Sequence, residues 1–337
     1  MLFKHKLFII QRMPSLDYIK NKIRGRGCKV IFADGADIRL PKAIRVLLDE
    51  ALVRPIVVIN SQESNLIEKY PLGTEIIDCA DPKQAEKWAK KVAALDSGRE
   101  IERVIRDFTN PLYAAATILA ANGADAMVAG LIDTTREVIR AMIHRVGLDT
   151  GRELASSYFL LDFAANPKNF GLLALADCGM VIDPTAEQLA QIAIDTAQST
   201  TRLLDWAPKV AMLSFSTLGS ATSDSTKKVA QATEIIKIRY PRLDIVGEVQ
   251  LDAAINREIA ETKLPADAAV KGDANVLIFP NLDAGNIGYK IIEQLTGAHA
   301  YGPVLQGFAK SASDLSRGST VEDIIGAASI AAADSLK

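Results

Sequence analysis

Short runs of apolar and β-branched residues alternate with longer amphipathic stretches along the first half of the chain. The runs predict strands at residues 30–33, 56–59, 75–78 and 126–129. Between them, helical periodicity predicts helices beginning near 41 and at about 84–95, 99–107 and 111–121. Regular alternation of strands and helices is typical of an α/β fold with a largely parallel sheet.

The same alternation continues in the second half, after a change of domain that we place around residues 150–157. Strands are predicted at 159–161, 172–176, 210–213, 244–247 and 275–279. Helices are predicted from 185 to about 204, after the polar loop 214–225 to about 238, near 286, and from 319 or 320 to the end. The fold class we predict is therefore α/β throughout.

Composition and charge exclude several classes of protein. The 337 residues suggest about two domains, and a net charge of −2 gives no basic field for nucleic acid. The apolar run 7–10 is too short to span a membrane, so we expect an N-terminal extension and a cytoplasmic protein. The three cysteines and three histidines are scattered, which argues against a disulfide framework or a metal site. A Ser-His-Asp arrangement stays open.

The richest chemistry lies in residues 301–324. A turn at Gly302-Pro303 opens this stretch, and Ser316, Arg317 and Asp323 place a hydroxyl, a cation and a carboxylate just before and inside the last helix. Such a set could hold a phosphorylated acyl group while a nucleophile loses its proton. The alternative is structural, because Thr320 with Asp323 three residues later also matches a helix capping box.

Two further stretches look like anion sites at strand-to-helix turns. Thr134 and Thr135 follow the strand at 126–129, and Arg140 follows on the helix. Gly285 and Asn286 follow the strand at 275–279, where glycine permits close backbone approach. A simple threonine cap and a tight turn are the respective alternatives.

The stretch "YGPVLQGFAKSASDLSRGSTVEDI" (301–324) resembles the C-terminal signature of the phosphotransacetylases. The family pattern has Gly-Pro, Gln-Gly and then Lys-Pro-Val-Asn-Asp-Leu-Ser-Arg-Gly. Here residues 311–313 (Ser-Ala-Ser) replace Pro-Val-Asn, while 314–318 are intact. The stretches 124–147, 247–255 ("GEVQLDAAI") and 279–290 ("FPNLDAGNIGYK") resemble the family as well.

This resemblance implies an architecture and an assembly. It implies two α/β domains with mostly parallel sheets, related to isocitrate and isopropylmalate dehydrogenases, with the active site in the cleft between them. The first domain would comprise residues 1–154 plus 306–337, and the second 155–305. It also implies a homodimer or larger homo-oligomer, and no metal for the chemical step.

The resemblance further implies a reaction, the reversible conversion of acetyl phosphate and coenzyme A to acetyl-coenzyme A and phosphate, with no permanently bound cofactor. In that reaction Asp323 would take the thiol proton, Ser316 would stabilise the reacting groups, and Arg317 and Arg140 would hold the phosphoryl oxygens. Thr134, Thr135, Gly285, Asn286 and Gln306 would contact substrate.

A physical difficulty accompanies this scheme. An ordinary aspartate and a thiol differ by roughly 4.6 pKa units, and a helix N-terminus would lower the pKa of Asp323 further. Three functions remain as alternatives to acetyl transfer. They are butyryl transfer, non-catalytic sensing of acyl-coenzyme A and, more distantly, the activity of a dehydrogenase of the related fold.

Overall fold

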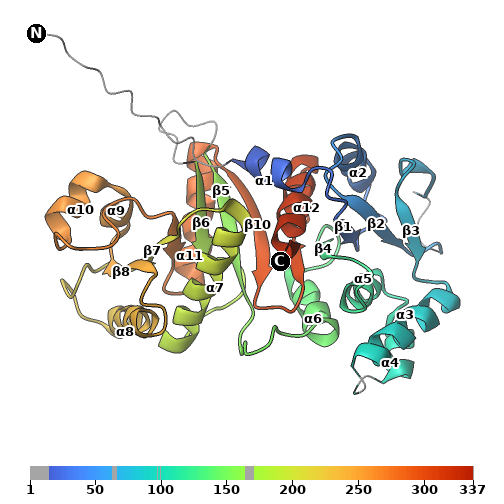
Figure 1. Cartoon of the computed structure of the whole chain (residues 1–337), viewed down its shortest axis with the longest axis horizontal. Helices are drawn as coiled ribbons and strands as arrows, with labels where there is room; N and C mark the ends of the chain where they lie inside the picture. Colours follow the sequence, from blue (N-terminus) through green and yellow to red (C-terminus); the bar gives the residue numbers. More distant parts are fainter. Residues whose placement is uncertain (1–14, 63–66, 97, 99, 164–170, 337) are drawn as a thin grey trace, which may run out of the picture.

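The computed structural model describes residues 15–336 apart from 63–66, 97, 99 and 164–170. The expected N-terminal extension therefore lies outside the described residues. The predicted alternation of strands and helices is confirmed (Figure 1).

Within the described residues, eleven strands form one continuous sheet in the order β3-β2-β1-β4-β11-β10-β5-β6-β9-β7-β8. Their bounds, in sheet order, are β3 Glu75–Asp78, β2 Arg54–Ile59, β1 Lys29–Phe32, β4 Ala126–Ala129, β11 Ser311–Asp314, β10 His299–Gln306, β5 Ser156–Asp162, β6 Leu172–Ala176, β9 Val276–Ile278, β7 Lys209–Leu213 and β8 Asp244–Val249. Antiparallel pairing joins β11 to β10, β10 to β5 and β5 to β6, whereas the other described pairs are parallel. The mostly parallel α/β class is confirmed.

Helices cover both faces of the sheet. One face carries a single continuous core beneath α1 (Leu16–Ile23), α2 (Leu40–Asp49), α12 (Val321–Ser335), α7 (Ala186–Leu204) and α8 (Asp224–Arg239). The other face carries two separate cores. The first lies under α3 (Pro82–Leu95), α4 (Ile101–Asp107), α5 (Pro111–Ala120) and α6 (Thr135–Arg145), and the second under α9 (Leu251–Ile255), α10 (Arg257–Lys263) and α11 (Leu282–Thr296).

Side-chain alternation along the strands explains these layers. In β1, Val30 and Phe32 belong to the continuous core, whereas Ile31 between them belongs to a core on the opposite face. The same split occurs in β5, where Leu160 and Leu161 point to opposite sides. Because both faces are covered, these strands read as unbroken apolar runs.

The turn predicted at Gly302-Pro303 was wrong, because these residues lie in β10, which pairs with β11 in antiparallel fashion in the middle of the sheet. Gly302 and Pro303 sit at a register shift between Tyr301 and Val304, and Gly302 has a φ of 149°. Glycine and proline are turn signals, but within a strand they mark a bulge instead. The small polar sequence of β11 gave no strand pattern.

The start of α11 was also misplaced. The helix begins at Leu282, and its N-cap residue Asn281 accepts a hydrogen bond from Ala284 N at 3.0 Å. Asn286 therefore lies in the second turn, where backbone N–H groups bond within the helix rather than pointing outward. The prediction that a helix begins at Asn286 and offers free N–H groups to an anion there was therefore wrong.

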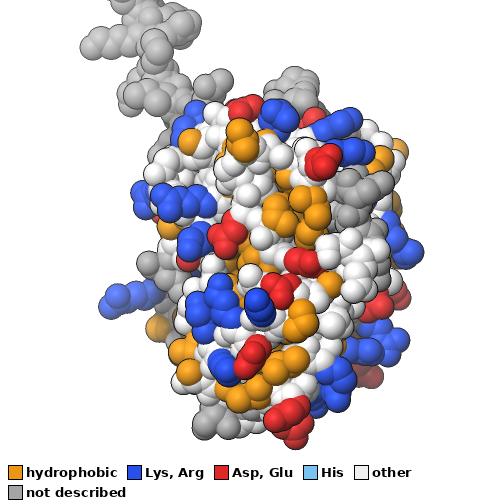
Figure 2. All heavy atoms as spheres, turned by 90° about the vertical axis from the view of Figure 1, so that its right-hand side faces the viewer, with side chains coloured by type: hydrophobic (Ala, Val, Ile, Leu, Met, Phe, Trp, Pro, Cys, Tyr) orange, Lys and Arg blue, Asp and Glu red, His pale blue; other side chains and the backbone are white. Residues whose placement is uncertain are grey.

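The end of the chain returns to its first half. Strand β11 pairs with β4 in parallel, and α12 packs against α1 and α2 (Figure 1). The division into residues 1–154 plus 306–337 and residues 155–305 stays a prediction. On the outer face at the β3 end, cationic and anionic side chains are interspersed (Figure 2).

Candidate active site

A cavity of about 580 Å³ opens where elements of the two halves meet. The first half and the C-terminal segment contribute Thr135 of α6, the turn at residues 315–320 and Asp323 of α12. The second half contributes Phe159 of β5, the loop at 178–179, the inner side of α11 and the start of β10. As expected, Thr135, Asn286 and Ser316 line the same cavity, although they are far apart in sequence.

Helix α6 begins where the sequence predicted. Its N-cap residue Thr134 forms a capping box with Glu137: Thr134 N and Oγ1 both lie 2.8 Å from Glu137 Oε2, and Glu137 N donates to Thr134 Oγ1 at 3.4 Å. The hydroxyl of Thr134 is thus committed to the cap. Thr135, one residue further, lines the cavity.

Two arginines gather near the start of α6. Hydrogen bonds from Thr134 hold the pKa of Glu137 below its usual range, and the positive charges of Arg140 and Arg317 lower that pKa further. Both guanidinium groups are therefore near one carboxylate, although 177 positions separate them in the chain. Both side chains are exposed, and neither is among the residues that line the cavity.

The turn that carries Ser316 and Arg317 is fixed by a residue that the sequence did not single out. Arg39 pairs with Asp37 at 2.6 Å and donates to the carbonyl oxygens of Arg317 at 2.9 Å and Ser319 at 2.5 Å. Within the turn, Ser316 N donates to Ser319 Oγ at 3.0 Å. These contacts place the Ser316 side chain against the cavity.

Asp323 has two sets of partners. Its Oδ2 accepts from Thr320 N at 2.7 Å and from Thr320 Oγ1 at 2.9 Å, which is the predicted capping box. Its Oδ1 lies 2.7 Å from Nε2 of His299. Burial opposes ionisation, but the hydrogen bonds from His299 and Thr320 outweigh it and hold the pKa of Asp323 below its usual range.

His299 is a site residue that sequence reasoning missed. It lies at the first position of β10, lines the cavity and stands 24 positions before Asp323. The hydrogen bond that His299 donates to Asp323 raises the pKa of His299 despite partial burial. A Ser-His-Asp set of residue types therefore lines one cavity, but the described residues show no hydrogen bond between Ser316 and His299.

Buried carboxylates lie beneath the site at the ends of β1 and β11. Burial raises the pKa of Asp34 and of Asp314 to about 7 each, and the negative charges of Asp34 and Asp133 add to the shift of Asp314. Asp314 lies so close to the backbone at Gly130 that a Cβ there would come within 2.2 Å of its Oδ1. The glycine, which has a φ of 107°, lets the end of β4 reach β11.

The opposite wall is built on a loop held by one buried carboxylate. Asp177 Oδ1 accepts from Ser157 Oγ at 2.7 Å, Gly179 N at 2.8 Å and Met180 N at 3.0 Å. Helix α11 packs onto this loop at Gly285, where a Cβ would lie 2.3 Å from the carbonyl oxygen of Asp177. Gly285 thus serves close packing and does not line the cavity.

Two side chains of α11 complete this wall. Asn286 Nδ2 donates to the carbonyl oxygen of Cys178 at 2.9 Å. The ring of Tyr289 stacks on that of Phe159 with centroids 4.2 Å apart. This pair gives the polar cavity one flat aromatic surface.

Comparison with known proteins decides the family. The profile of the phosphate acetyl/butaryl transferase family matches residues 15–332. The chain belongs to this family. It is 36% identical over 329 residues to a phosphate acetyltransferase of Acetivibrio thermocellus, covering 95% of this chain and 98% of that one.

Solved structures agree with this membership. A phosphotransacetylase from Streptococcus pyogenes superposes with a TM-score of 0.83 at 36% identity, covering 94% of this chain and 97% of that one. A structure from Salmonella typhimurium described as a 4-hydroxythreonine-4-phosphate dehydrogenase superposes with a TM-score of 0.51 at 12% identity, covering 91% and 99%. The second likeness shows the fold alone and supports the predicted dehydrogenase-like architecture.

Gln306 lies apart from the cavity. It is buried at the end of β10, where its Nε2 donates to Ser156 Oγ at 2.8 Å and to Thr196 Oγ1 at 3.0 Å. Among the residues that the family resemblance picked out, Gln306 and Gly285 therefore support the walls, whereas Thr135, Asn286, Ser316 and Asp323 line the space between them.

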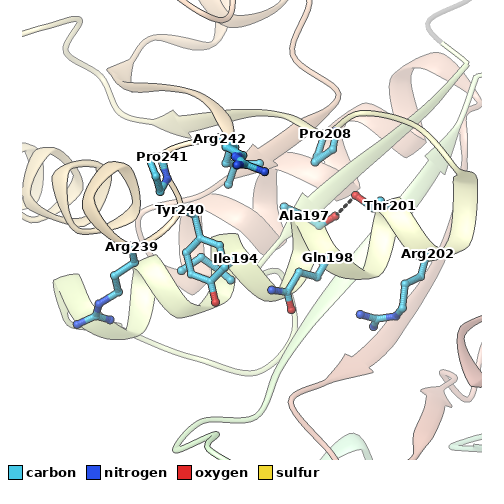
Figure 3. A pocket seen from close by; sticks show the side chains of 11 residues that line it. Ile194, Ala197, Gln198, Thr201, Arg202, Pro208, Arg239, Tyr240, Pro241 and Arg242 are labelled. Atoms are coloured by element: carbon cyan, nitrogen blue, oxygen red, sulfur yellow. Dashed lines mark hydrogen bonds between the residues drawn. The ribbon is translucent and has the colours of Figure 1, made fainter. Parts of the chain in front are cut away.

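A second cavity, of about 610 Å³, lies between α7 and the turn after α8 (Figure 3). Ile194 and Ala197 form part of its base, and Tyr240 lies over α7 near Ile194. It is the larger of the two, but none of the candidate site residues lines it. Of these two cavities, the smaller is therefore the one that candidate site residues line.

Neither a metal cluster nor a membrane-spanning helix is found among the described residues. No group of three or more histidine, cysteine, aspartate or glutamate residues is arranged there to hold a metal ion. Nor does the described part of the chain contain a helix with the length and hydrophobicity needed to cross a membrane.

Proposed function

We propose that this chain catalyses the reversible transfer of an acetyl group between acetyl phosphate and coenzyme A. One observation carries the proposal: Thr135 of α6 and the C-terminal residues Ser316 and Asp323, far apart in sequence, line one cavity in a chain of the phosphate acetyl/butaryl transferase family. The cavity of about 580 Å³ is in the range of small-molecule sites. Phosphate acetyltransferases are also the relatives that resemble the chain along most of its length.

The phosphoryl group of acetyl phosphate binds beside the start of α6. Arg140 and Arg317 both lower the pKa of Glu137, so two positive charges lie near the start of α6, and in our proposal both guanidinium groups bind the phosphoryl group. Thr135 adds a hydroxyl at the same place, and Thr134 keeps the helix start in shape through its capping box. Two cations at this point also stabilise the charge that gathers on the leaving phosphate.

Acyl transfer then proceeds by direct attack of the thiol. The sulfur of coenzyme A forms a bond to the carbonyl carbon of acetyl phosphate, and the Ser316 hydroxyl donates a hydrogen bond to the carbonyl oxygen as charge develops on it. The bond from carbon to the bridging phosphate oxygen breaks, and phosphate leaves with the electron pair. The thiol proton passes first to the Asp323–His299 pair and finally to the departing phosphate.

Coenzyme A is a substrate in this proposal and no cofactor is permanently bound. Asn286 and the stacked Tyr289 and Phe159 line the wall opposite Ser316, where the thiol arm of coenzyme A would pass. We also propose a cytoplasmic location with no nucleic acid or membrane partner, and the small net charge of −2 fits the absence of a nucleic-acid partner.

We further propose a homodimer or larger homo-oligomer. Its support is an apolar stripe on α11, where Ile287, Ile291 and Leu295 recur every four residues and are 57%, 52% and 81% exposed. Exposed apolar rows of this kind are typical of protein interfaces. Light scattering on the purified chain tests the assembly, and Leu295→Glu should shift it toward the monomer.

Butyryl transfer is the second candidate, because the matching family includes both activities. The test supplies the purified chain with coenzyme A and either acetyl phosphate or butyryl phosphate, and follows thioester formation. A higher kcat/KM for acetyl phosphate supports the proposal. A higher value for butyryl phosphate reassigns the acyl group, and no thioester with either donor favours a non-catalytic acyl-coenzyme A sensor.

A further inference from the structure

His299 and Asp323 form a close pair inside the cavity. No sequence pattern predicted this pair. His299 Nε2 lies 2.7 Å from Asp323 Oδ1, and the side chains are 41% and 22% exposed respectively. Both residues line the cavity together with Ser316. Strand β10 supplies the histidine and α12 the aspartate, so the sheet topology creates the pair.

The hydrogen bonds define the histidine tautomer. Asp323 Oδ2 already accepts from Thr320 N and Oγ1, while Oδ1 meets the imidazole. An ionised carboxylate can only accept, so Nε2 of His299 carries a hydrogen and the lone pair of the neutral ring lies on Nδ1. In the described part of the chain, no protein group hydrogen-bonds to this Nδ1.

The surrounding contacts hold the imidazole in place. The rings of His299 and Tyr301 lie with their centroids 4.5 Å apart. Tyr301 in turn packs onto α12 at Gly326, where a Cβ would come within 2.4 Å of the tyrosine ring. The glycine therefore lets β10 approach α12 closely enough for histidine and aspartate to meet.

Asp323 is poorly suited to take a thiol proton. Although burial acts in the opposite direction, its hydrogen bonds from His299 and Thr320 keep its pKa below the usual range. A thiol has an ordinary pKa of about 8.5, at least about 4.6 pKa units above that of the carboxylate. Transfer of the proton to Asp323 is therefore strongly uphill.

His299 is much better matched to the thiol. An ordinary imidazole has a pKa of about 6.5, and the hydrogen bond to Asp323 raises that of His299. The carboxylates of Asp323 on α12, Glu293 on α11 and Asp162 on β5 act on it in the same direction. Lys290 is the cationic residue that α11 contributes to the cavity lining.

We propose that His299 accepts the proton of the coenzyme A thiol through Nδ1, while Asp323 is a positioning residue that orients the ring and stabilises the imidazolium. This inference rests on the proposed function and assigns one step of it. As sulfur attacks the acetyl carbon, the S–H proton moves to Nδ1. The imidazolium then gives that proton to the departing phosphate, so the ring returns to its neutral form.

Nuclear magnetic resonance of the full chain with labelled histidine tests the pair independently of activity. His299→Gln identifies the His299 signals among those of the three histidines. In the wild type we expect the neutral ring to carry its hydrogen on Nε2, and Asp323→Asn to lower the pKa of His299. A neutral ring with its hydrogen on Nδ1, or a pKa unaffected by Asp323→Asn, would overturn the inference.

Kinetics test the proton transfer itself. The glutamine of His299→Gln can still donate to Asp323 but cannot take a proton, so turnover should fall by about 10²–10⁴-fold while the melting temperature holds. Added imidazole should restore part of the turnover of His299→Ala. The control His144→Gln lies outside the cavity and should keep wild-type turnover.

The outcomes separate this inference from the proposed function. Wild-type turnover in His299→Gln would leave Asp323 as the base and refute the proton-accepting role of His299. If the wild type forms no thioester at all, the proposed function fails. The resonance measurement then still decides whether the His299–Asp323 pair exists as described.

Discussion

Thr320 and Asp323 hold each other at the first turn of α12: the carboxylate accepts from Thr320 N at 2.7 Å, and Asp323 N donates to Thr320 Oγ1 at 3.2 Å. The same carboxylate reaches His299 with its other oxygen. Asp323 is therefore both part of the helix cap and a residue of the candidate active site. Its structural and its catalytic interpretation do not exclude each other. The cap fixes one oxygen so that the other can face the histidine.

Asp323→Asn should separate these two roles. The amide oxygen of asparagine can still accept at the cap, so the loss in free energy of unfolding should be at most about 1 kcal/mol. Turnover should fall by about 10²–10⁴-fold because the histidine loses its anionic partner. The loss should shrink as pH approaches about 8.5, where free thiolate needs no base.

A matched control uses the capping box at the start of α7, which Thr185 and Gln188 form away from the cavity. Thr185→Ala should lower the free energy of unfolding by about 1 kcal/mol and leave turnover intact. Melting curves and pH–rate profiles of the wild type, Asp323→Asn and Thr185→Ala measure the two effects side by side. Equal turnover in wild type and Asp323→Asn would remove the carboxylate from the mechanism.

Arg317→Ala should weaken the binding of acetyl phosphate. A charged hydrogen bond contributes about 1.5–3 kcal/mol, so kcat/KM for acetyl phosphate should fall by about 10- to 150-fold. Arg317→Lys should recover little, because an ammonium group cannot reproduce the planar fork of a guanidinium. Arg136→Ala, one turn from Arg140 on α6 but with no assigned role, is the control. Near-normal kinetics in Arg317→Ala would exclude Arg317 from the phosphate site.

Gly285→Ala should loosen the wall formed by α11. The added Cβ would lie 2.3 Å from the carbonyl oxygen of Asp177, so helix and loop must move apart. We expect a loss of about 1–3 kcal/mol in the free energy of unfolding. At Gly288 an added Cβ would meet the Phe279 ring at 3.1 Å, so Gly288→Ala should cost less. Urea unfolding of both variants measures the difference, and equal stability would contradict the packing described.

The buried carboxylates Asp34 and Asp314 should make the protein less stable as pH rises. Burial raises the pKa of each to about 7, so both favour the protonated form in the folded state. Their stabilisation is fully present below the unfolded pKa of about 3.8 and is lost as pH climbs through about 7. As pH rises from about 3.8 to about 7, the ionisation of Asp314 alone should lower the free energy of unfolding by about 2–4 kcal/mol.

Asp314→Asn provides the test of this pH dependence. Asparagine stays neutral, so the variant should melt at a higher temperature than wild type at pH 8 and at a similar one near pH 4. Asp177→Asn is the contrasting control, because its carboxylate accepts several backbone N–H bonds that an amide nitrogen cannot accept. It should be destabilised. If Asp314→Asn were also destabilised at pH 8, Asp314 would be ionised in the folded protein.

Local patterns were enough to predict much of the fold. The apolar run before Gly130 and the threonine cap after it correctly placed β4 and the start of α6, because strand, loop and cap are all local signals. The middle of the sheet was not predictable in this way. Gly302 and Pro303 are local turn signals, and only pairing with β5 and β11 holds them in a strand.

The site shows the same limit. Ser316, Arg317 and Asp323 are close in sequence and could be grouped by pattern and resemblance. His299 stands alone in the sequence, and only the packing of β10 on α12 brings it to Asp323. Arg39, which holds the Ser316 turn through two carbonyl oxygens, was likewise hidden by its distance in sequence.

The most direct test of the central claim is the reaction of the purified wild-type chain with acetyl phosphate and coenzyme A, with both products quantified. The account predicts acetyl-coenzyme A and phosphate in equal amounts, and re-formation of acetyl phosphate when the reaction runs from those products. Hydrolysis of acetyl phosphate without thioester, or no reaction, would contradict it.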